Sequence, residues 1–426
     1  MKDRTITSAV LLTLLLAILF NFGISLGAVD SLSGSGSFVV QSTIDWWPMF
    51  HHDLSHTGFS PSTAPETNHT AWTSRPGGGF EWSSAAIVDD AVYVGSSDGY
   101  VFSLNATTGT VIWNATTGGI VESSPAVVDG SVYVGSYDCK VYALNASSGR
   151  QMWNYTAGGN VISSPSVAYG EVFVGSWAGI NGNVYALNAS TGEQVWMYAT
   201  GGVVMSSPAV VDGKVFIGSG DANVYALNAS TGERVWNYTT GDSVYSSPSV
   251  VDGIVYVGSL DGKAYALNAT DGQLIWSQTI GPVGLSSPAV AYGTVYVGSN
   301  DHNAYALNTS TGAPIWNYTT GNYVVSSPAV AGGMVFVGSY DSSVYALNSS
   351  TGVRIWSYKT DDEVLSSAAV VNGTVFIGSM DGTFYAFGPE NVVPEFSSFL
   401  VLPSFMAVTL LAVFVFRRKR VPPSRE

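Results

Sequence analysis

The segment 46–58 reads WWPMFHHDLSHTG. It contains three histidines and an aspartate in a stretch of six residues. They are His51, His52, Asp53 and His56. Imidazole nitrogens and carboxylate oxygens are zinc ligands, so this spacing could hold a metal ion. The alternative is a lead-in segment that packs over a larger domain through its own aromatic residues, Trp46, Trp47 and Phe50. We favour the second interpretation and predict no metal site here.

One aspartate recurs in each of seven repeated units, and a ring of carboxylates could bind a cation. The seven are Asp98, Asp138, Asp221, Asp261, Asp301, Asp341 and Asp381. Asp is also favoured in turns, and turns set away from a common axis would not bring their side chains to one ion. The remaining unit carries WAGINGN (177–183) instead, a three-residue insertion that is either a contact loop or neutral.

The composition limits the classes of partner. The 426 residues carry a formal net charge of −15, whereas a nucleic-acid-binding protein usually presents a basic face. Only 11% of the residues are charged, while Gly is abundant (48) and aromatic residues reach 12%, which favours short strands and tight turns. Cys139 is the only cysteine, so no intramolecular disulfide can form. We therefore predict no nucleic-acid partner and a fold stabilised by packing.

A tryptophan recurs about every 40 residues. The eight are Trp72, Trp113, Trp153, Trp196, Trp236, Trp276, Trp316 and Trp356. One unit contains four short apolar runs, which are MSSPAVV (205–211), KVFIGS (214–219), NVYALN (223–228) and VWNYTT (235–240). Asp212-Gly213 between the first two runs favours a tight hairpin, whose backbone needs positive φ. Four antiparallel strands repeated at a fixed period are typical of a β-propeller blade.

Counting the runs predicts how the ring closes. The SSPAV-type run occurs eight times, but the last unit meets Pro389 without a Trp-bearing strand. Trp72, in TAWTS (70–74), precedes the first unit and is left over. The counts balance if this strand completes the last blade. We therefore predict an all-β, eight-bladed β-propeller of four-stranded antiparallel blades over residues 70–388, closed by the N-terminal Trp72 strand.

The repeat resembles the quinoprotein-type (PQQ-like) β-propeller repeat, which is similar to that of the bacterial outer-membrane-assembly lipoprotein propeller. The family signature Ala-x-Asp-x-x-Thr-Gly-x-x-x-Trp reads here Ala226-Leu-Asn228-Ala-Ser-Thr231-Gly232-Glu-Arg-Val-Trp236. The resemblance covers about residues 72–388. It implies that each Trp packs against the turn of the neighbouring blade. A buried indole contributes a large apolar area and an N–H donor, so we expect the eight tryptophans to dock blades.

The resemblance also raises the question of a cofactor. Enzymes of this family bind pyrroloquinoline quinone and usually Ca²⁺ at the ring centre, and some carry adjacent cysteines there. Cys139 cannot supply such a pair, and no CxxCH haem signature occurs. The innermost runs offer small uncharged residues, and only Trp82 and Glu122 depart from this pattern in the first two units. We predict no catalytic, cofactor-binding or metal-binding residue and place a PQQ-dependent dehydrogenase last.

Asn replaces the signature Asp, and thirteen Asn-x-Ser/Thr sequons are present. They are Asn68, Asn105, Asn114, Asn145, Asn154, Asn188, Asn228, Asn237, Asn268, Asn308, Asn317, Asn348 and Asn372. In an exported protein these are N-glycosylation acceptors, although duplication of one turn Asn would also copy the triplet. We predict that glycans cover one face and the rim of the ring and leave the other face free for a partner.

Two apolar segments flank the repeats. Residues 1–28 have a charged start, an apolar stretch and small residues near the end, as in a signal peptide; an uncleaved anchor helix is the alternative. Residues 29–69 are the lead-in segment. Residues 399–416 are long enough for a transmembrane helix, and the basic tail 417–426, with RRKR at 417–420, would stay cytoplasmic.

The linker 389–398 contains Pro394-Glu395-Phe396. This PEF motif, followed by an apolar helix and a basic cluster, resembles the archaeal PEF-type sorting signal. The resemblance implies cleavage by a sortase-like transpeptidase and transfer to another anchor, whereas the alternative is an ordinary stop-transfer anchor. Either arrangement holds the propeller at the extracellular face of the cell membrane.

These features predict a non-catalytic, cell-surface glycoprotein. Its expected function is a protein-interaction or assembly scaffold, and the alternative is a carbohydrate- or small-ligand-binding module of the envelope. The expected partner is an unknown protein or glycan at the cell surface, the membrane is reached through the C-terminal helix, and no cofactor is expected.

Overall fold

The computed structural model describes residues 45–389, and all regular elements in this range are β-strands. The predicted signal peptide, the PEF motif and the predicted C-terminal transmembrane segment lie outside the described residues. Over residues 45–389, no helix with the length and apolar character of a membrane span is present.

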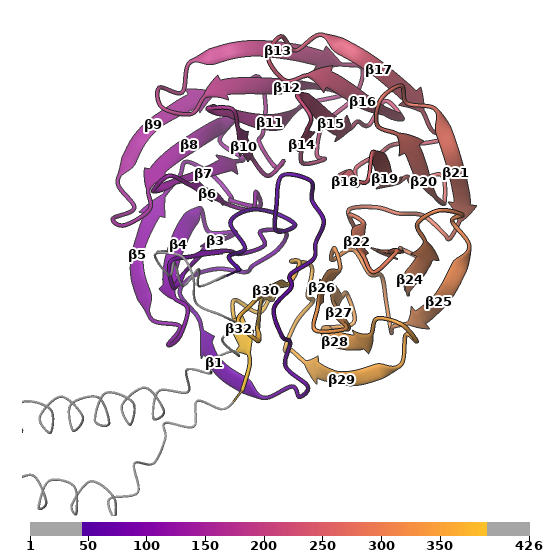
Figure 1. The fold of residues 1–426 in the computed structure, drawn as a ribbon. Helices are drawn as coiled ribbons and strands as arrows, with labels where there is room; N and C mark the ends of the chain where they lie inside the picture. The colour runs from indigo at the N-terminus through magenta and orange to yellow at the C-terminus, as the bar shows by residue number, and fades with distance from the viewer. Residues whose placement is uncertain (1–44, 390–426) are drawn as a thin grey trace, which may run out of the picture. The chain divides into compact units, whose positions relative to one another are not determined.

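Thirty-two strands form eight four-stranded antiparallel sheets around one central axis (Figure 1). The innermost strands are β2 (Ala86–Val88), β6 (Ala126–Val128), β10 (Ser166–Ala168), β14 (Ala209–Val211), β18 (Ser249–Val251), β22 (Ala289–Ala291), β26 (Ala329–Ala331) and β30 (Ala369–Val371). The second strands are β3 (Ala91–Gly95), β7 (Ser131–Ser136), β11 (Glu171–Ala178), β15 (Lys214–Gly218), β19 (Ile254–Gly258), β23 (Thr294–Gly298), β27 (Met334–Ser339) and β31 (Thr374–Gly378).

The other two strands of each blade lie nearer the rim. The third strands are β4 (Tyr100–Asn105), β8 (Lys140–Asn145), β12 (Asn181–Asn188), β16 (Asn223–Asn228), β20 (Lys263–Asn268), β24 (Asn303–Asn308), β28 (Ser343–Asn348) and β32 (Phe384–Phe387). The outermost strands are β5 (Val111–Thr116), β9 (Gln151–Thr156), β13 (Gln194–Thr200), β17 (Arg234–Thr239), β21 (Leu274–Thr279), β25 (Pro314–Thr319), β29 (Arg354–Lys359) and β1 (Thr70–Ser74). The predicted eight-bladed, all-β propeller is confirmed.

The innermost strands are shorter than the run MSSPAVV predicts, because β14 contains only its last three residues. Pro208 has no N–H for a ladder. The Ser206 hydroxyl instead accepts the Gly218 N–H at 3.0 Å, and the Ser207 N–H donates to Ser247 of the next blade at 2.8 Å. The predicted hairpin is present, with φ of 48° at Asp212 and 70° at Gly213.

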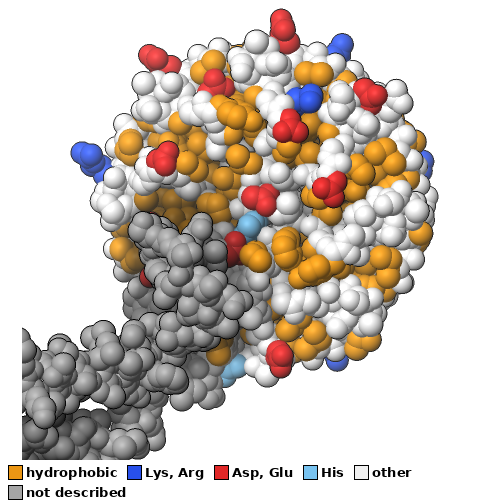
Figure 2. Space-filling model, in the orientation of Figure 1, with side chains coloured by type: hydrophobic (Ala, Val, Ile, Leu, Met, Phe, Trp, Pro, Cys, Tyr) orange, Lys and Arg blue, Asp and Glu red, His pale blue; other side chains and the backbone are white. Residues whose placement is uncertain are grey.

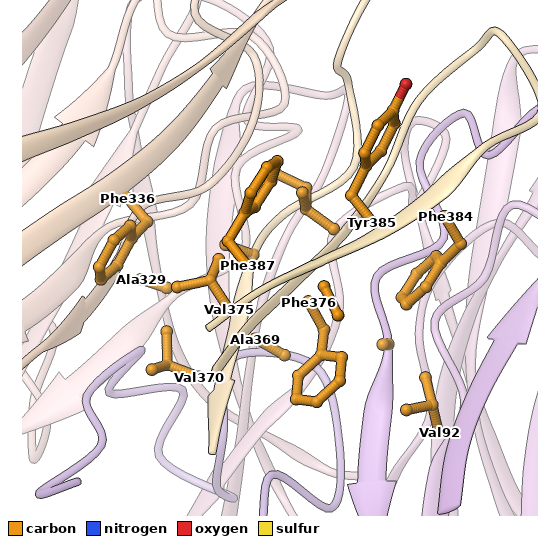
Figure 3. Packing of buried hydrophobic residues seen from close by; sticks show 14 of the residues in the cluster. Val92, Ala329, Phe336, Ala369, Val370, Val375, Phe376, Phe384, Tyr385 and Phe387 are labelled. Atoms are coloured by element: carbon orange, nitrogen blue, oxygen red, sulfur yellow. The ribbon is translucent and has the colours of Figure 1, made fainter. Parts of the chain in front are cut away.

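The eighth blade is built from both ends of the ring. β1 pairs antiparallel with β32, with Trp72 opposite Ala386, and the sheet order is β1-β32-β31-β30. Figure 3 shows the apolar side chains of β30, β31 and β32 packed beside Phe336 and Val92 of the adjacent blades. The N-terminal strand therefore closes the ring and removes a free seam.

Each Trp of the repeat joins one blade to the next. The Trp196 indole N–H donates to the Ala229 carbonyl in the next blade at 2.7 Å, and the ring is 7% exposed. Gly232 lies against this ring with φ of +72°, and a Cβ there would approach Trp196 to 2.7 Å. The eighth blade has no turn after its third strand, because β32 is the last strand of the chain's described part. Trp356 of the seventh blade therefore donates to the Pro65 carbonyl of the lead-in segment, at 2.8 Å. The apolar core is accordingly divided into layers between adjacent blades.

Candidate binding site at the mouth of the central channel

The strand turns divide the ring into two faces. The turns between first and second strands and between third and fourth strands lie together, as the bond from Ala229 N to Gly213 O (2.9 Å) indicates. We call this side the hairpin face. The turns between second and third strands lie with the loops that join blades, as in the bond from Thr240 N to Ala222 O (2.8 Å). We call that side the loop face.

The lead-in segment closes the channel at the hairpin face, and Figure 1 shows it crossing the centre of the ring. Its backbone carbonyls accept N–H groups from the innermost strands of six blades at 2.7–2.8 Å. The donors are Ile87, Val127, Val210, Val250, Val290 and Val330, and the acceptors are Trp47, Pro48, Leu54, Ser55, Thr57 and Gly58. Because an unpaired buried N–H is costly, these bonds hold the segment in the channel.

The histidines of this segment are structural. The His56 Nδ1–H donates to the Pro248 carbonyl (3.2 Å), and His51 Nδ1 lies 3.3 Å from the His56 carbonyl. Burial lowers the pKa of His51 to about 3 and that of His56 to about 4, so both rings are neutral. His52 lies between Asp45 (3.0 Å) and Asp53 (3.3 Å), whose carboxylates raise its pKa although burial opposes this. Within residues 45–389, no group of three His, Cys, Asp or Glu side chains could hold a metal ion.

The repeated aspartates lie apart, in turns of the loop face. Asp221 is typical, because one carboxylate oxygen accepts both the Tyr225 hydroxyl (2.7 Å) and the Gly201 N–H of the preceding blade (2.7 Å). The same Tyr contact is made by Asp138, Asp261, Asp301, Asp341 and Asp381. Asp98 lacks it, because Phe102 replaces the tyrosine. These carboxylates therefore fasten loops between blades.

The sequons are distributed unevenly over the two faces. Seven lie at the ends of third strands on the hairpin face, where Asn228 Oδ1 accepts the N–H groups of Ser230 (2.9 Å) and Thr231 (3.0 Å). Asn372 lies in a hairpin of the same face, and Asn68 precedes β1. Four occupy outermost strands, namely Asn114, Asn154, Asn237 and Asn317. None lies in the turns or loops of the loop face, so attached glycans would leave that face open.

The loop face contains a small cavity at the mouth of the channel, with a volume of about 50 Å³. Each blade contributes the residue that precedes its Ser-Ser pair. These residues, the mouth ring, are Trp82, Glu122, Ile162, Met205, Tyr245, Leu285, Val325 and Leu365. Phe50 of the lead-in segment also lines the cavity. Seven of the eight mouth-ring side chains are apolar or aromatic, so the cavity suits an apolar group.

A closed ring of serines lies next to the mouth ring. The second Ser of each pair accepts the N–H of its counterpart in the preceding blade at 2.8–3.0 Å, around all eight blades. The members are Ser84, Ser124, Ser164, Ser207, Ser247, Ser287, Ser327 and Ser367. The last bond, from Ser367 N to Ser84 Oγ, completes the circle. This ring fixes the positions of the mouth-ring side chains.

Glu122 is the only ionisable carboxyl group in the mouth ring. It is 6% exposed, and the Tyr137 hydroxyl donates to its Oε2 at 2.7 Å. Burial and the neighbouring Glu81 carboxyl raise the pKa of Glu122 to about 8, so it is protonated at neutral pH. Trp82 Nε1 beside it is buried and has no hydrogen-bond partner among the described residues. The mouth thus has one hydrogen-bond donor without a partner among residues 45–389, the Trp82 indole N–H, in an apolar wall.

Sequence reasoning noticed Trp82 and Glu122 but did not assign them to a site. The signal was their position before Ser-Ser in two adjacent units, where other units carry aliphatic residues. Recognising the site also required the lead-in segment, because Phe50 closes the cavity from the opposite side.

The described residues do not fit the quinone and Ca²⁺ of the related enzymes. Ligand sites for molecules of that size have volumes of about 300–1,000 Å³, whereas this cavity has about 50 Å³. The nearby carboxyls are Glu81 and Glu122, and the raised pKa of Glu122 opposes a carboxylate ligand for Ca²⁺. The remainder of the channel is filled by the chain's own Phe50, His51 and His56.

The fold and the repeat resemble those of the PQQ-like β-propellers. The family model described as "Outer membrane protein assembly factor BamB" matches residues 281–391, and "Beta-alanine-activating enzyme, beta-propeller" matches residues 54–254. The predicted resemblance to the PQQ-like repeat family is thereby confirmed. No curated protein sequence matches the chain.

Solved structures with this fold include proteins of different kinds. BamB from Moraxella catarrhalis is 22% identical with a TM-score of 0.66, over 75% of this chain and 99% of that one. Quinohemoprotein alcohol dehydrogenase from Comamonas testosteroni is 17% identical (TM-score 0.72; 81% and 80% covered). A europium-containing methanol dehydrogenase is 14% identical (TM-score 0.69; 81% and 98% covered). At these identities the likeness is one of fold.

Proposed function

We propose that the protein is a cell-surface scaffold that binds a partner protein at the channel mouth of its loop face. The observation that carries this proposal is the apolar mouth ring, which lies on the face without sequons. Partly exposed residues at the starts of the surrounding turns extend it outward, namely Tyr137, Trp177, Leu260, Tyr340 and Met380. Apolar side chains that are partly exposed around an opening are typical of interaction sites.

The hairpin face is less suited to a partner. Its channel opening is already occupied by the lead-in segment, whose carbonyls are bonded to six blades. On the side seen in Figure 2, charged side chains stand singly among hydrophobic and uncharged polar ones. The sequons of seven third-strand ends also lie on the hairpin face. Glycans there would leave the loop face as the accessible surface.

The size of the cavity favours a side chain over a free ligand. About 50 Å³ accommodates the end of one apolar side chain, and it is well below the volume of typical small-molecule sites. The description of the matching model for residues 281–391 as an assembly factor supports the scaffold proposal. The carbohydrate-binding alternative predicts binding on a glycan array that Trp82→Ala abolishes.

A cross-linking experiment in the native membrane tests this proposal. The photoreactive residue p-benzoylphenylalanine replaces either Tyr340, beside the mouth, or Ser230, an exposed residue of the hairpin face. The full-length chain should form a discrete adduct with another protein from position 340 and none from position 230. Absence of an adduct at 340, or identical adducts from both positions, would contradict the proposal.

We also propose export, anchoring by the C-terminal segment and glycosylation of several sequons. Protease added to intact cells should degrade the propeller, and glycopeptide mass spectrometry should find modified Asn on the hairpin face. Complete protection from protease would contradict the proposed surface location. If every sequon peptide were unmodified, the proposed glycosylation would be wrong.

A further inference from the structure

The third blade carries a projection that the other seven lack. β11 and β12 have eight residues each, whereas the equivalent strands of the other blades have six at most. The extra length comes from the insertion in WAGINGN, and it extends the hairpin on the loop face. An eightfold-repeated surface offers a partner many similar orientations, and this projection removes that equivalence.

The tip of the projection is rigid. Ala178 pairs with Asn181, so Gly179 and Ile180 form a two-residue turn, and φ of 64° at Gly179 fits a type II′ hairpin. The Trp177 indole N–H donates to the Gly179 carbonyl at 2.6 Å, and the Trp177 backbone N–H donates to Asn160 at 2.8 Å. A tip held in this way loses little conformational freedom when it binds.

The rigid tip presents an apolar side chain to solvent. Ile180 is 84% exposed, more than any other large hydrophobic residue among residues 45–389. A single exposed aliphatic residue is unremarkable on its own, but this one stands on a braced insertion beside the proposed partner site. Trp177, three residues before it, is the counterpart of Tyr137 in the preceding blade, and the Tyr137 hydroxyl donates to Glu122 of the mouth ring at 2.7 Å.

The surrounding turns are acidic. In addition to the seven turn aspartates, acidic side chains occur at Glu81, Asp242, Asp361, Asp362 and Glu363. The basic residues at the loop-face ends of strands are Arg75, Lys140, Lys263 and Lys359. Because complementary charge steers association and disfavours wrong partners, a partner that covers this face should be basic.

We infer that the β11–β12 hairpin is the orientation determinant of the loop face, where Ile180 enters an apolar pocket on a partner protein whose surrounding surface is basic. This inference rests on the proposed function, since the partner is the one that contacts the mouth. It adds the element that selects one of eight similar docking orientations, and it specifies the partner's chemistry.

The test places p-benzoylphenylalanine at position 180, 340 or 353 of the full-length chain in its native membrane. Val353 is the matched control, because it is 64% exposed but lies on the hairpin face. Positions 180 and 340 should cross-link the same protein, and position 353 should not. An adduct at 340 without one at 180 overturns the inference and leaves the proposed function standing. An adduct at 180 with a second copy of this chain also overturns it, and no adduct at 340 overturns the proposed function itself.

Point variants give an independent measure. Ile180→Ser should lower the yield of the position-340 adduct about ten- to hundredfold, as expected when one aliphatic side chain loses its pocket, whereas Val353→Ser should leave the yield unchanged. Raising the salt concentration from about 0.05 to about 0.5 M should lower the yield severalfold through charge screening. An unchanged yield in Ile180→Ser, or a yield that is insensitive to salt, contradicts the corresponding part of the inference.

Discussion

The two ends of the central channel use neutral titratable groups in opposite ways. At the hairpin face, His51 and His56 are buried within the lead-in segment and their contacts are internal to the chain. At the loop face, Glu122 lies in a cavity beside Trp82, whose indole N–H has no partner among residues 45–389. One end is completed by the chain itself, and the other retains hydrogen-bonding capacity for something else.

This difference gives the two ends opposite pH dependence. The pKa of each buried histidine is lowered, so its contribution to stability is present above about pH 6.5 and is lost as the pH falls toward about 3 for His51 and about 4 for His56. The pKa of Glu122 is raised to about 8, so its contribution is present below about pH 4.5 and is lost as the pH rises to about 8. Stability should therefore be greatest near pH 6.5.

The largest effect is expected from removing an aromatic residue at the closed end. Trp47 is 1% exposed, whereas Trp82 at the open end is partly exposed. Trp47→Ala should lower the free energy of unfolding by about 3–5 kcal/mol, and Trp82→Ala by clearly less. Chemical denaturation of the two variants measures this contrast. Equal losses would mean that both ends are equally structural.

The second-largest effect is expected from acidification, which should lower the stability of the closed end. Between pH 6.5 and 5, each of His51 and His56 should cost about 2 kcal/mol of unfolding free energy, because the unfolded chain takes up the proton and the folded one does not. Replacing both with Gln should flatten the acid side of the stability profile. His302→Gln, outside the lead-in segment, serves as the control, and an equal flattening there would refute the assignment.

Much of this fold could be predicted from the sequence because each blade repeats the same local information. The Trp period set the blade length, and the unpaired run around Trp72 indicated closure, which the pairing of β1 with β32 matches. Asp212-Gly213 indicated the hairpin because this turn requires positive φ. These features depend on residues close in sequence or on a simple count of strands.

The channel mouth could not be predicted in the same way, because it depends on contacts between distant segments. Phe50 reaches the cavity from the lead-in segment, and Trp356 bonds Pro65 almost 300 residues away in sequence, with a separation of 291. No local pattern specifies where the lead-in segment lies. The three-residue insertion at 177–183 was visible as a loop, but its rigidity depends on the Trp177 contacts with Gly179 and Asn160.

A smaller effect is expected at the open end from neutralising its carboxyl group. Glu122→Gln retains the shape and a hydrogen-bond partner for the Tyr137 hydroxyl. The variant should gain up to about 3.5 kcal/mol of unfolding free energy relative to the parent at pH 8, because the unfolded parent chain ionises at pH 5–8 while its folded state resists ionisation. At pH 5 the two should be alike. Thermal unfolding at both pH values measures this, and a gain that is independent of pH would contradict the assigned protonation.

The smallest effect is expected at the hairpin-face turns, where the sequons separate modification from folding. Asn228→Asp retains an acceptor oxygen for the Ser230 and Thr231 N–H groups, so the free energy of unfolding should change by no more than about 0.5 kcal/mol. The same change removes one glycan acceptor. If the loop face alone contacts the partner, the position-340 cross-link should be unaffected even when all seven turn Asn are changed together. A loss of the cross-link with unchanged stability would instead place part of the partner contact on the hairpin face. The contrast between a closed end and a partner-binding end of the channel would then be wrong.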